Sequence, residues 1–180
     1  MEWLWYRRWR RRLFARLESL PRRTVVQRDK RTLEVGVGTG KNLPFYRDSG
    51  WGAGIDFSEG MLSHARPIAR KQNSVLVQAD AQQLPFEDGV FDAVFATFVF
   101  CSVPDPVLGL REIRRVLKPG GQVLLLEHVL PENRFLAMFF NKLNPLTVKQ
   151  AGVHINRRTA ENIRKAGFVR SASYWVTPFS

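Results

Sequence analysis

From Arg31 onward the chain alternates short apolar, β-rich runs with amphipathic stretches. Strands are expected at 32–37, 53–56, 75–78, 91–96 and 122–128, helices at 58–72 and 106–117, and a turn at 118–121. A short helix or turn is expected from Phe45. Continuous apolar strands separated by helices are typical of a parallel sheet covered on both faces. The pattern therefore predicts a doubly wound, mostly parallel α/β domain with helices on both faces.

The first 23 residues follow a different pattern. Trp5, Trp9, Leu13, Leu17 and Leu20 recur at steps of three and four residues, which predicts an amphipathic helix that ends before residue 21. Eight residues of this arm are arginine and two are glutamate. The expected organisation is therefore a basic N-terminal helix at 1–23 and one α/β domain at 24–180.

The charge of the chain favours an anionic partner, because 28 Lys and Arg against 16 Asp and Glu give a net charge of +12. The interspersed arginines exclude a membrane span, but they suit a helix in the plane of a bilayer surface. Trp5 and Trp9 would then lie among the headgroups, with Arg8 and Arg12 near the phosphates. Alternatively, the helix caps the active site and packs on the sheet, and these two roles can coexist. RNA binding is a third possibility.

Cysteine content and targeting signals bear on location. Cys101 is the only cysteine, so the chain forms no internal disulfide, which suits a reducing cytoplasm. The N-terminus lacks the apolar core and small-residue cleavage site of a signal peptide. We therefore expect a cytoplasmic protein that associates peripherally with a membrane.

The first strand ends in a glycine-rich segment. Gly36, Gly38 and Gly40 stand at alternate positions, and Glu34 lies two residues before the first of them. Glycine lets the loop turn sharply and lets its backbone approach a ligand. A dinucleotide site would place its third glycine at position 41, where this chain has Lys41. The segment therefore departs from the nicotinamide pattern.

Two aspartates follow the next two strands. Asp56 lies about twenty residues after the first glycine, the spacing at which a carboxylate binds ribose hydroxyls. Asp80 could accept a hydrogen bond from an adenine amine, with Met61 or Leu84 against the ring. Either aspartate alone could simply form a turn or cap a helix. Three such features in order, each at a strand end, favour a nucleoside site.

These residues resemble the Rossmann-like family of S-adenosylmethionine-dependent methyltransferases. The similar segments are 33–40, 54–62, 80–86, 91–94 and 115–121, so the resemblance runs from about residue 31 to residue 128. It implies S-adenosylmethionine as cofactor and S-adenosylhomocysteine as product. By this resemblance Glu34 and the three glycines hold the methionine part, Asp56 the ribose, and Asp80 with Ala81 the adenine. The other cofactor candidates are Asn42, Phe57, Met61 and Thr97.

Methyl transfer needs alignment of the acceptor with the methyl carbon more than it needs a reactive side chain. No Cys/His set with the spacing of metal ligands is present in the sequence, so no metal is expected. Tyr46, His128 or His154 could take the proton from an amine acceptor. Tyr46 could instead cover the cofactor, and each histidine could be structural.

The acceptor should be chosen by the segments after the fourth and fifth strands and by the arm. Segments 101–106, 126–129 and 154–159 resemble a small bacterial branch of the family assigned to phospholipid or membrane-associated methylation. Phe100 is expected in an apolar wall, and Arg157, Arg158 or Lys149 could hold a phosphate. The stretch 135–146 could line a lipid tail or lie against the sheet. The predicted acceptor is therefore the amine of phosphatidylethanolamine.

Other acceptors remain open. A quinone precursor or a small hydrophobic thiol would use the same cofactor site and arm, through C-, O- or S-methylation. A nucleic-acid methyltransferase is disfavoured because no Asn/Asp-Pro-Pro-aromatic motif follows the fourth strand. A lipid-binding module without enzymatic activity is the least favoured alternative, because the residues that resemble a cofactor site would then have no function. The family usually closes its sheet with an antiparallel hairpin of two strands. Only one strand is expected here, within 168–176, so the stability of this edge of the sheet is an open question.

Overall fold

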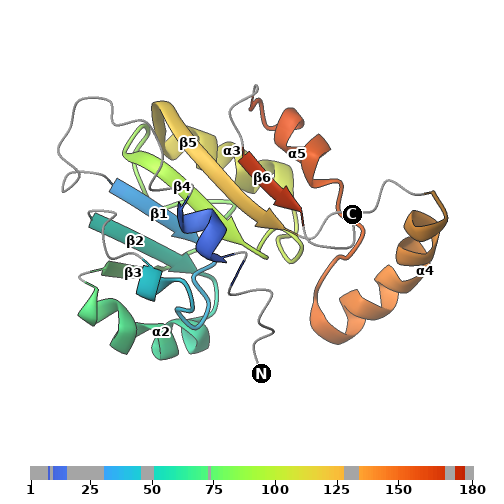
Figure 1. The fold of residues 1–180 in the computed structure, drawn as a ribbon, viewed down its shortest axis with the longest axis horizontal. Helices are drawn as coiled ribbons and strands as arrows, with labels where there is room; N and C mark the ends of the chain where they lie inside the picture. The colour runs from blue at the N-terminus through green and yellow to red at the C-terminus, as the bar shows by residue number, and fades with distance from the viewer. Residues whose placement is uncertain are drawn as a thin grey trace.

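A six-stranded sheet forms the centre of the molecule in the computed structural model, which describes residues 8, 10–15, 31–45, 51–72, 74–127, 134–168 and 173–176 (Figure 1). The strands are β1 (Arg31–Val35), β2 (Trp51–Asp56), β3 (Ser74–Gln78), β4 (Phe91–Thr97), β5 (Leu117–Glu127) and β6 (Ser173–Val176). They lie in the order β3-β2-β1-β4-β5-β6, and all neighbours pair in parallel. The predicted parallel sheet is confirmed, and its strand order reverses between β1 and β4.

The connecting helices are η2 (Leu43–Phe45), α2 (Glu59–Lys71), α3 (Pro106–Val116), α4 (Arg134–Ala151) and α5 (Thr159–Lys165). Helix α2 begins after Ser58, whose hydroxyl accepts a hydrogen bond from the Met61 N–H at 3.3 Å. Helix α3 begins after Asp105, whose carboxylate accepts two backbone N–H bonds, and Pro106 occupies its first turn. Both starts follow ordinary capping chemistry, and α2 and α3 lie where the sequence predicts helices. Helices α4 and α5 were not predicted.

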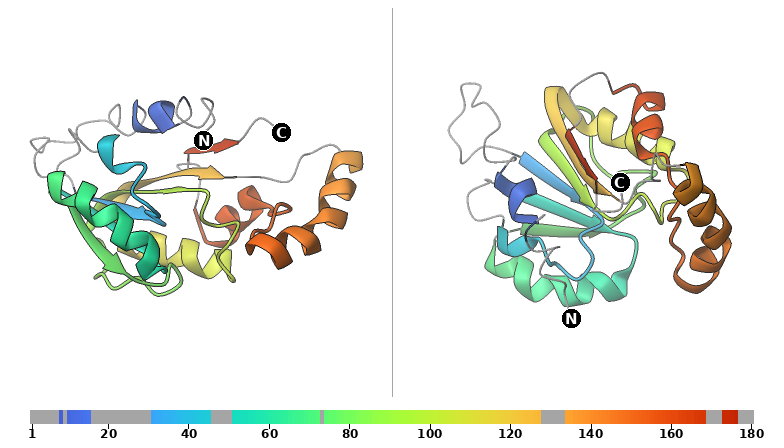
Figure 2. Two further views of the ribbon diagram at one scale, coloured as in Figure 1. Left: turned by 90° about the horizontal axis from the view of Figure 1, so that it is seen from below. Right: turned by 45° about the vertical axis from the view of Figure 1, so that its right-hand side comes forward.

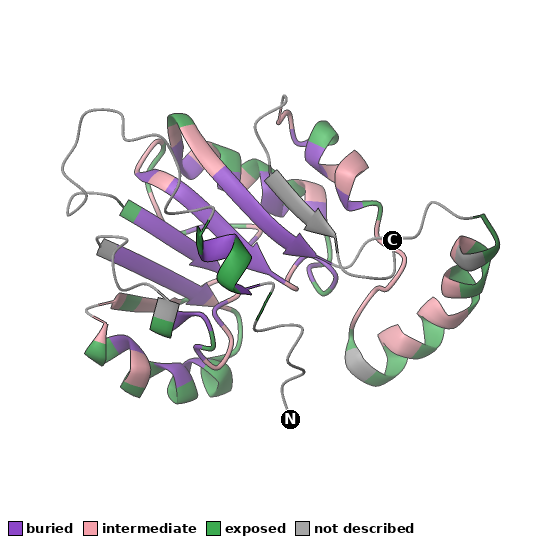
Figure 3. Cartoon of the chain, in the orientation of Figure 1, coloured by how far each residue is buried: buried purple, intermediate pink, exposed green. Residues whose placement is uncertain are grey.

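Each face of the sheet has its own core, because side chains alternate between the faces along every strand. Val94 and Leu125 pack with α3 and α5 through residues such as Ile113. Phe95 and Leu124 belong to the opposite cluster, which also includes residues of α2 and of the N-terminal helical segment. Figure 2 shows that segment and α3 on opposite sides of the sheet, and Figure 3 shows that the central strands β1, β2 and β4 are largely buried.

Part of the N-terminal arm packs on the sheet. Residues 10–15 are helical, and Leu13 and Phe14 are buried. The ring of Phe14 meets the ring of Phe95 edge to face, with centroids 5.2 Å apart. Arg8 and Arg12 are exposed, whereas Trp5 and Trp9 lie outside the described residues. The packing supports a capping role, while the full amphipathic helix and its membrane contact stay predictions.

The structure differs from the expected pattern in several connections. Strand β5 already begins at Leu117, so the predicted turn at 118–121 lies within it as an irregularity where Gly120 has a φ of 78°. The 3₁₀ helix η2 ends at Phe45 instead of beginning there. The apolar stretch 135–146 belongs to α4, which carries exposed apolar side chains, so it does not lie against the sheet as one reading allowed. Strand β6 forms one edge, paired in parallel with β5.

A substitution at Phe14 tests the packing of the arm. Phe14→Ala should lower the free energy of unfolding by about 3 kcal/mol, because it removes a buried ring from the cluster around Phe95. Arg11→Ala is the matched control on the same helical turn, since Arg11 is exposed. Urea unfolding of both variants measures the difference. Equal stability of the two variants would show that the arm does not pack here.

Candidate functional site

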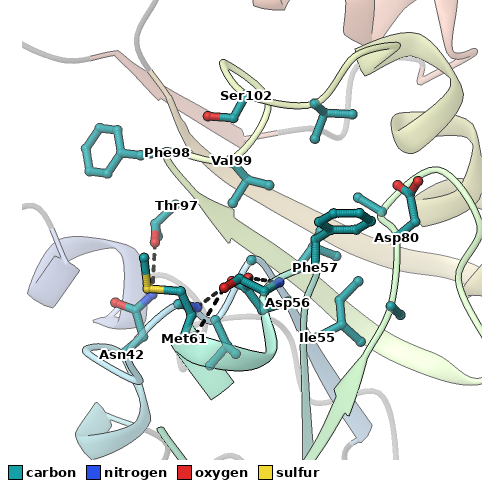
Figure 4. A pocket seen from close by; sticks show the side chains of 18 of the residues that line it. Asn42, Ile55, Asp56, Phe57, Met61, Asp80, Thr97, Phe98, Val99 and Ser102 are labelled. Atoms are coloured by element: carbon teal, nitrogen blue, oxygen red, sulfur yellow. Dashed lines mark hydrogen bonds between the residues drawn. The ribbon is translucent and has the colours of Figure 1, made fainter. Parts of the chain in front are cut away.

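A cavity of about 760 Å³ lies at the carboxyl ends of β1, β2 and β4, where the strand order reverses. This is the expected position for a ligand in a doubly wound sheet, and the volume lies within the range of small-molecule sites. The walls come from the glycine-rich loop after β1, the start of α2, the segment after β3 and the loop after β4. Figure 4 shows Phe57 and Asp80 on one side and Phe98, Val99 and Ser102 on another.

The glycine-rich loop brings bare backbone to the cavity. The N–H groups of Gly36 and Val37 both donate to the carbonyl of Ile55 at 2.8 Å, which turns the loop across the end of β2. Gly36 and Gly38 have φ values of 73° and 55°, a region that favours glycine. A Cβ at Gly36 would lie 2.2 Å from a methyl of Val99, whereas one at Gly38 would meet no protein atom within 4 Å. Gly38 therefore presents its backbone to open space in the cavity.

Asp56 connects this loop to the next helix. Its Oδ2 accepts from the Gly38 N–H at 2.8 Å, and its Oδ1 accepts from the Ser58 N–H at 2.9 Å. A carboxylate has about four acceptor positions, so these two bonds leave capacity for hydroxyl donors in the cavity that Asp56 lines. The geometry fits the predicted ribose site, and it also gives Asp56 the local structural role that the alternative reading assigned to it.

Asp80 is held by its neighbour Gln82. The Gln82 backbone N–H donates to Asp80 Oδ1 at 2.8 Å, and the Gln82 side-chain amide lies 3.2 and 3.1 Å from the two carboxylate oxygens. Gln82 Oε1 in turn accepts from the Asp105 N–H at 2.8 Å, at the start of α3. Gln82 lines the cavity and was missed from the sequence, where a glutamine after an aspartate gives no distinctive signal.

The apolar side chains beside Asp80 suit a flat ring. Phe57 and Met61 line the cavity with 76% and 47% of their surfaces exposed. Large apolar side chains exposed at a cavity gain contact area when an aromatic ligand covers them. Leu84, the other residue considered for this role, is buried in the core and does not line the cavity. Ala81 does line it, as predicted.

A buried polar network lies beneath the cavity. Asn42 donates through Nδ2 to Glu34 and to the hydroxyl of Thr97, the latter at 3.0 Å. Glu34 is fully buried and does not itself line the cavity, whereas Asn42 and Thr97 do. The Asn42 Oδ1 is buried and has no hydrogen-bond partner in the structure. Since buried acceptors are usually satisfied, this oxygen fits a ligand with an N–H donor, such as the ammonium of an amino acid.

Gly40 and Arg10 differ from their expected roles. Gly40 does not line the cavity, and a Cβ there would lie 2.8 Å from Leu43 and 3.1 Å from Ala65, so this glycine lets the loop pack on α2. Arg10, assigned only to the basic arm, is buried and lines the cavity. Burial lowers its pKa, and the nearby charge of Glu34 opposes that shift. The arm therefore contributes the guanidinium group of Arg10 to the lining of the cavity.

The loop after β4 is clamped by Glu127, the last residue of β5. Its Oε1 accepts from the Val99 and Phe100 N–H groups at 2.8 and 3.0 Å. Phe98 has a φ of 59°, unusual for a residue with a side chain, and its N–H donates to the Leu126 carbonyl at 2.8 Å. Burial raises the pKa of Glu127 to about 7, although the backbone N–H bonds oppose the shift.

The residues predicted to contact the acceptor lie mostly outside the cavity lining. Phe100 is buried in the core, so its expected place in the apolar wall is taken by Phe98 and Val99. Phe98 has a φ of 59°, so the chain after β4 turns here and does not continue as an extended strand. Arg157 donates to the Val103 carbonyl at 2.8 Å, behind the wall. Arg158 is exposed, 3.7 Å from Glu161, and does not line the cavity.

The proposed proton acceptors find little support. His154 does not line the cavity; its backbone N–H donates to the Cys101 carbonyl at 2.8 Å, and its Nδ1 lies 3.3 Å from the Asn144 amide. Burial lowers the pKa of His154. Tyr46 and His128 lie outside the described residues. Burial also raises the pKa of the Cys101 thiol to about 11, as suits a packed side chain instead of a nucleophile.

The chain is similar to known proteins over the segment that builds this cavity. A family model described as a methyltransferase domain matches residues 33–125. A phosphatidylethanolamine N-methyltransferase of Cereibacter sphaeroides is 40% identical over 123 residues, which cover 64% of this chain and 61% of that protein. A demethylmenaquinone methyltransferase of Staphylococcus aureus (strain MRSA252) is 38% identical over 130 residues, which cover 67% of this chain and 54% of that protein. The chain thus spans less than two thirds of the length of either relative.

Several solved structures share the fold. One of them is the phospholethanolamine N-methyltransferase 2 of Haemonchus contortus, in complex with phosphomonomethylethanolamine and S-adenosylhomocysteine. The TM-score is 0.72, the identity is 23%, and the match covers 91% of this chain and 37% of that chain. At this identity the likeness establishes the architecture, which agrees with the Rossmann-like fold expected from the sequence.

Substitutions in the loop and at Asp56 test cofactor binding. Gly38→Val would place a side chain in the cavity, and Asp56→Ala would remove the carboxylate that is predicted to accept from the ribose, so each should weaken S-adenosylmethionine binding by at least about tenfold. Gly89→Val is the matched control, because Gly89 also has positive φ, 66°, and open space around it but does not line the cavity. Isothermal titration compares the affinities. Parent-like binding by the first two variants would refute the assignment.

The pH dependence of stability tests the environment of Glu127. Its pKa is 4.5 ordinarily and about 7 in the folded protein, so the folded state binds the proton more tightly than the unfolded chain. The resulting stabilisation is fully present below pH 4.5 and is lost as the pH rises through 7, by on the order of 3 kcal/mol.

Glu127→Gln keeps an acceptor for the loop but does not titrate, so urea unfolding should show a flatter decline between pH 5 and pH 8 than in the parent. Comparison of the two proteins removes the contribution of the other titrating groups. The same slope in both would mean that Glu127 does not carry a raised pKa.

Proposed function

Because the chain belongs to the methyltransferase domain family, we propose that it transfers methyl groups from S-adenosylmethionine to the amine of a membrane phospholipid, phosphatidylethanolamine. The observation that carries the proposal is the cavity itself: bare backbone at Gly38 and the carboxylate of Asp56 on one side, and the apolar Phe98 and Val99 on another. The cofactor supplies an electrophilic methyl group, and the residues of this chain bind and orient the two reactants.

The cofactor side of the cavity offers partners for each part of S-adenosylmethionine. Asp56 would accept from the ribose hydroxyls and Asp80 from the adenine amine, with Phe57 and Met61 against the ring. The unsatisfied Asn42 Oδ1 would accept from the ammonium of the methionine part. Arg10 would contribute positive charge for its carboxylate. This set assigns a role to a residue of the arm, which would then complete the cofactor site as well as cover it.

The acceptor side of the cavity is apolar. Phe98, Val99 and Val103 line it, and Glu127 fixes the backbone of the first part of this wall. Such a wall would exclude water from the methyl carbon and hold the amine in line with it. None of the described lining residues is a histidine, so we assign no general base. The similarity to a phosphatidylethanolamine N-methyltransferase supports a phospholipid acceptor, as does the net charge of +12.

A quinone precursor is the second candidate acceptor. It is favoured by the 38% identity to a demethylmenaquinone methyltransferase, over a slightly longer stretch than the phospholipid-specific relative. The same apolar wall would suit a quinone ring, so the cavity does not distinguish the two. Transfer to carbon needs activation of the ring, whereas transfer to an amine needs only loss of its proton.

An acceptor assay separates the two candidates. Protein and radiolabelled S-adenosylmethionine are incubated with vesicles that contain phosphatidylethanolamine, or with phosphatidylcholine vesicles that contain demethylmenaquinone. We expect label in the phosphatidylethanolamine fraction only, and a rate reduced at least about tenfold by Gly38→Val, since this variant obstructs the cofactor part of the cavity. Label in the quinone and none in the phospholipid would transfer the assignment to the quinone precursor.

A further inference from the structure

Helix α4 projects from the domain (Figures 1 and 2). Four of its large apolar side chains are exposed: Phe135 at 81%, Met138 at 57%, Phe139 at 58% and Leu146 at 52%. Soluble domains seldom expose several large apolar residues of one element together. Figure 3 shows exposed positions along the whole of α4, and exposed apolar residues on one element indicate a partner.

These residues share one side of the helix. Positions 135, 138, 139 and 146 fall on one stripe at 3.6 residues per turn, and Lys142 and Lys149 fall within the same stripe and are exposed. The less exposed residues Phe140, Leu143 and Val148 lie outside this stripe. We call the stripe of Phe135, Met138, Phe139, Lys142, Leu146 and Lys149 the outward face of α4. The sequence of α4 contains no acidic residue.

Contacts on the other side of the helix fix the direction of this face. The Asn144 side chain accepts from the Ile155 N–H at 3.0 Å and lies 3.3 Å from the ring of His154. Asn156 donates to the Asn141 side chain at 3.0 Å. His154 also bonds to Cys101, in the loop after β4 that continues from the cavity wall. Through these bonds the orientation of α4 is connected to the acceptor side of the cavity.

We infer that the outward face of α4 docks on the surface of an anionic phospholipid bilayer. Apolar side chains would enter the boundary between headgroups and acyl chains, while Lys142 and Lys149 would meet lipid phosphates. No helix in the described part of the chain is long and apolar enough to cross a bilayer, so the contact would lie in the plane of the surface. The absence of acidic residues from α4 matches a negatively charged surface.

Charge also separates this partner from a second copy of the chain. Two outward faces brought together about a twofold axis would place Lys142 and Lys149 of both copies in one interface without an acidic residue of either α4. A bilayer instead supplies negative charge to every lysine. The inference deepens the proposed function and rests on it for its purpose, because a bilayer-bound α4 would bring the cavity to a lipid acceptor. Vesicle binding, however, is measurable without methyl transfer.

The test is co-sedimentation of the full chain with vesicles that contain neither phosphatidylethanolamine nor cofactor. One set is phosphatidylcholine alone, and the other contains equal amounts of phosphatidylcholine and phosphatidylglycerol. The double variant Phe135→Glu/Phe139→Glu should reduce partitioning onto the anionic vesicles at least about tenfold. Lys142→Gln/Lys149→Gln should reduce it several-fold on anionic vesicles only. Leu108→Glu is the matched control, since Leu108 is also exposed, at 41%, but lies on α3.

Circular dichroism and S-adenosylmethionine titration show whether each variant is folded. If the double glutamate variant does not fold, Met138→Cys carrying an environment-sensitive dye replaces it, since the native Cys101 is buried. Dye fluorescence should rise when anionic vesicles are added, and no change would overturn the inference. Partitioning of the folded Phe135→Glu/Phe139→Glu variant equal to that of the parent would also overturn the inference. If that variant also changed from dimer to monomer, the outward face of α4 would instead bind a second copy of the chain. If phosphatidylethanolamine proved not to be the methyl acceptor, these measurements of vesicle binding would still test the inference.

Discussion

The hydrogen bond from the Gly38 N–H to the Asp56 carboxylate joins the ends of the two strands on which the cavity depends. Strands β1 and β2 run in parallel with Val35 beside Ile55, so both end at the same edge of the sheet. The Ile55 carbonyl takes the first two N–H groups of the loop, and Asp56 takes the next one available at Gly38. The loop is thus held by β2 instead of by a helix of its own, and the backbone at Gly36 and Gly38, which carries no side chain, borders the cavity.

A second carboxylate holds the opposite side. Glu127 ends β5 as Asp56 ends β2, and both accept backbone N–H groups from the loop that follows a neighbouring strand. Their surroundings differ, because Glu127 is almost fully buried whereas Asp56 borders the cavity. Both anchors lie at strand ends in one sheet, so the sheet sets the separation between the glycine-rich loop and the loop after β4. In the proposed function these two walls would bind the cofactor and the methyl acceptor, respectively.

The sheet and the position of the cavity at its strand ends could be predicted from the sequence because their signals are local. Apolar runs locate the strands, and the glycines with Asp56 and Asp80 mark three strand ends, all of which border the cavity. The acceptor side could not be predicted in the same way. Phe98 has a left-handed backbone whose N–H bonds to Leu126, and the next two N–H groups bond to Glu127, far along the chain. The local pattern does not encode these bonds, so the residue selected for the wall was Phe100.

Two further features depend on tertiary contacts that periodicity does not encode. Arg10 reaches the cavity because Leu13 and Phe14, one turn later, pack on the sheet. The side of α4 that faces outward is set by Asn144 and the segment after the helix, so an apolar pattern alone could not distinguish burial from exposure. In both cases the sequence identified the chemical character of the segment, and the structure supplied its direction.

A crystal structure of the protein with S-adenosylhomocysteine would test the central assignment most directly. The account predicts both ribose hydroxyls within about 3 Å of the Asp56 carboxylate, and the amino acid part beside Gly36 and Gly38 with its nitrogen near Asn42. A nucleoside bound elsewhere, with Asp56 still bonded only to Gly38 and Ser58, would contradict it.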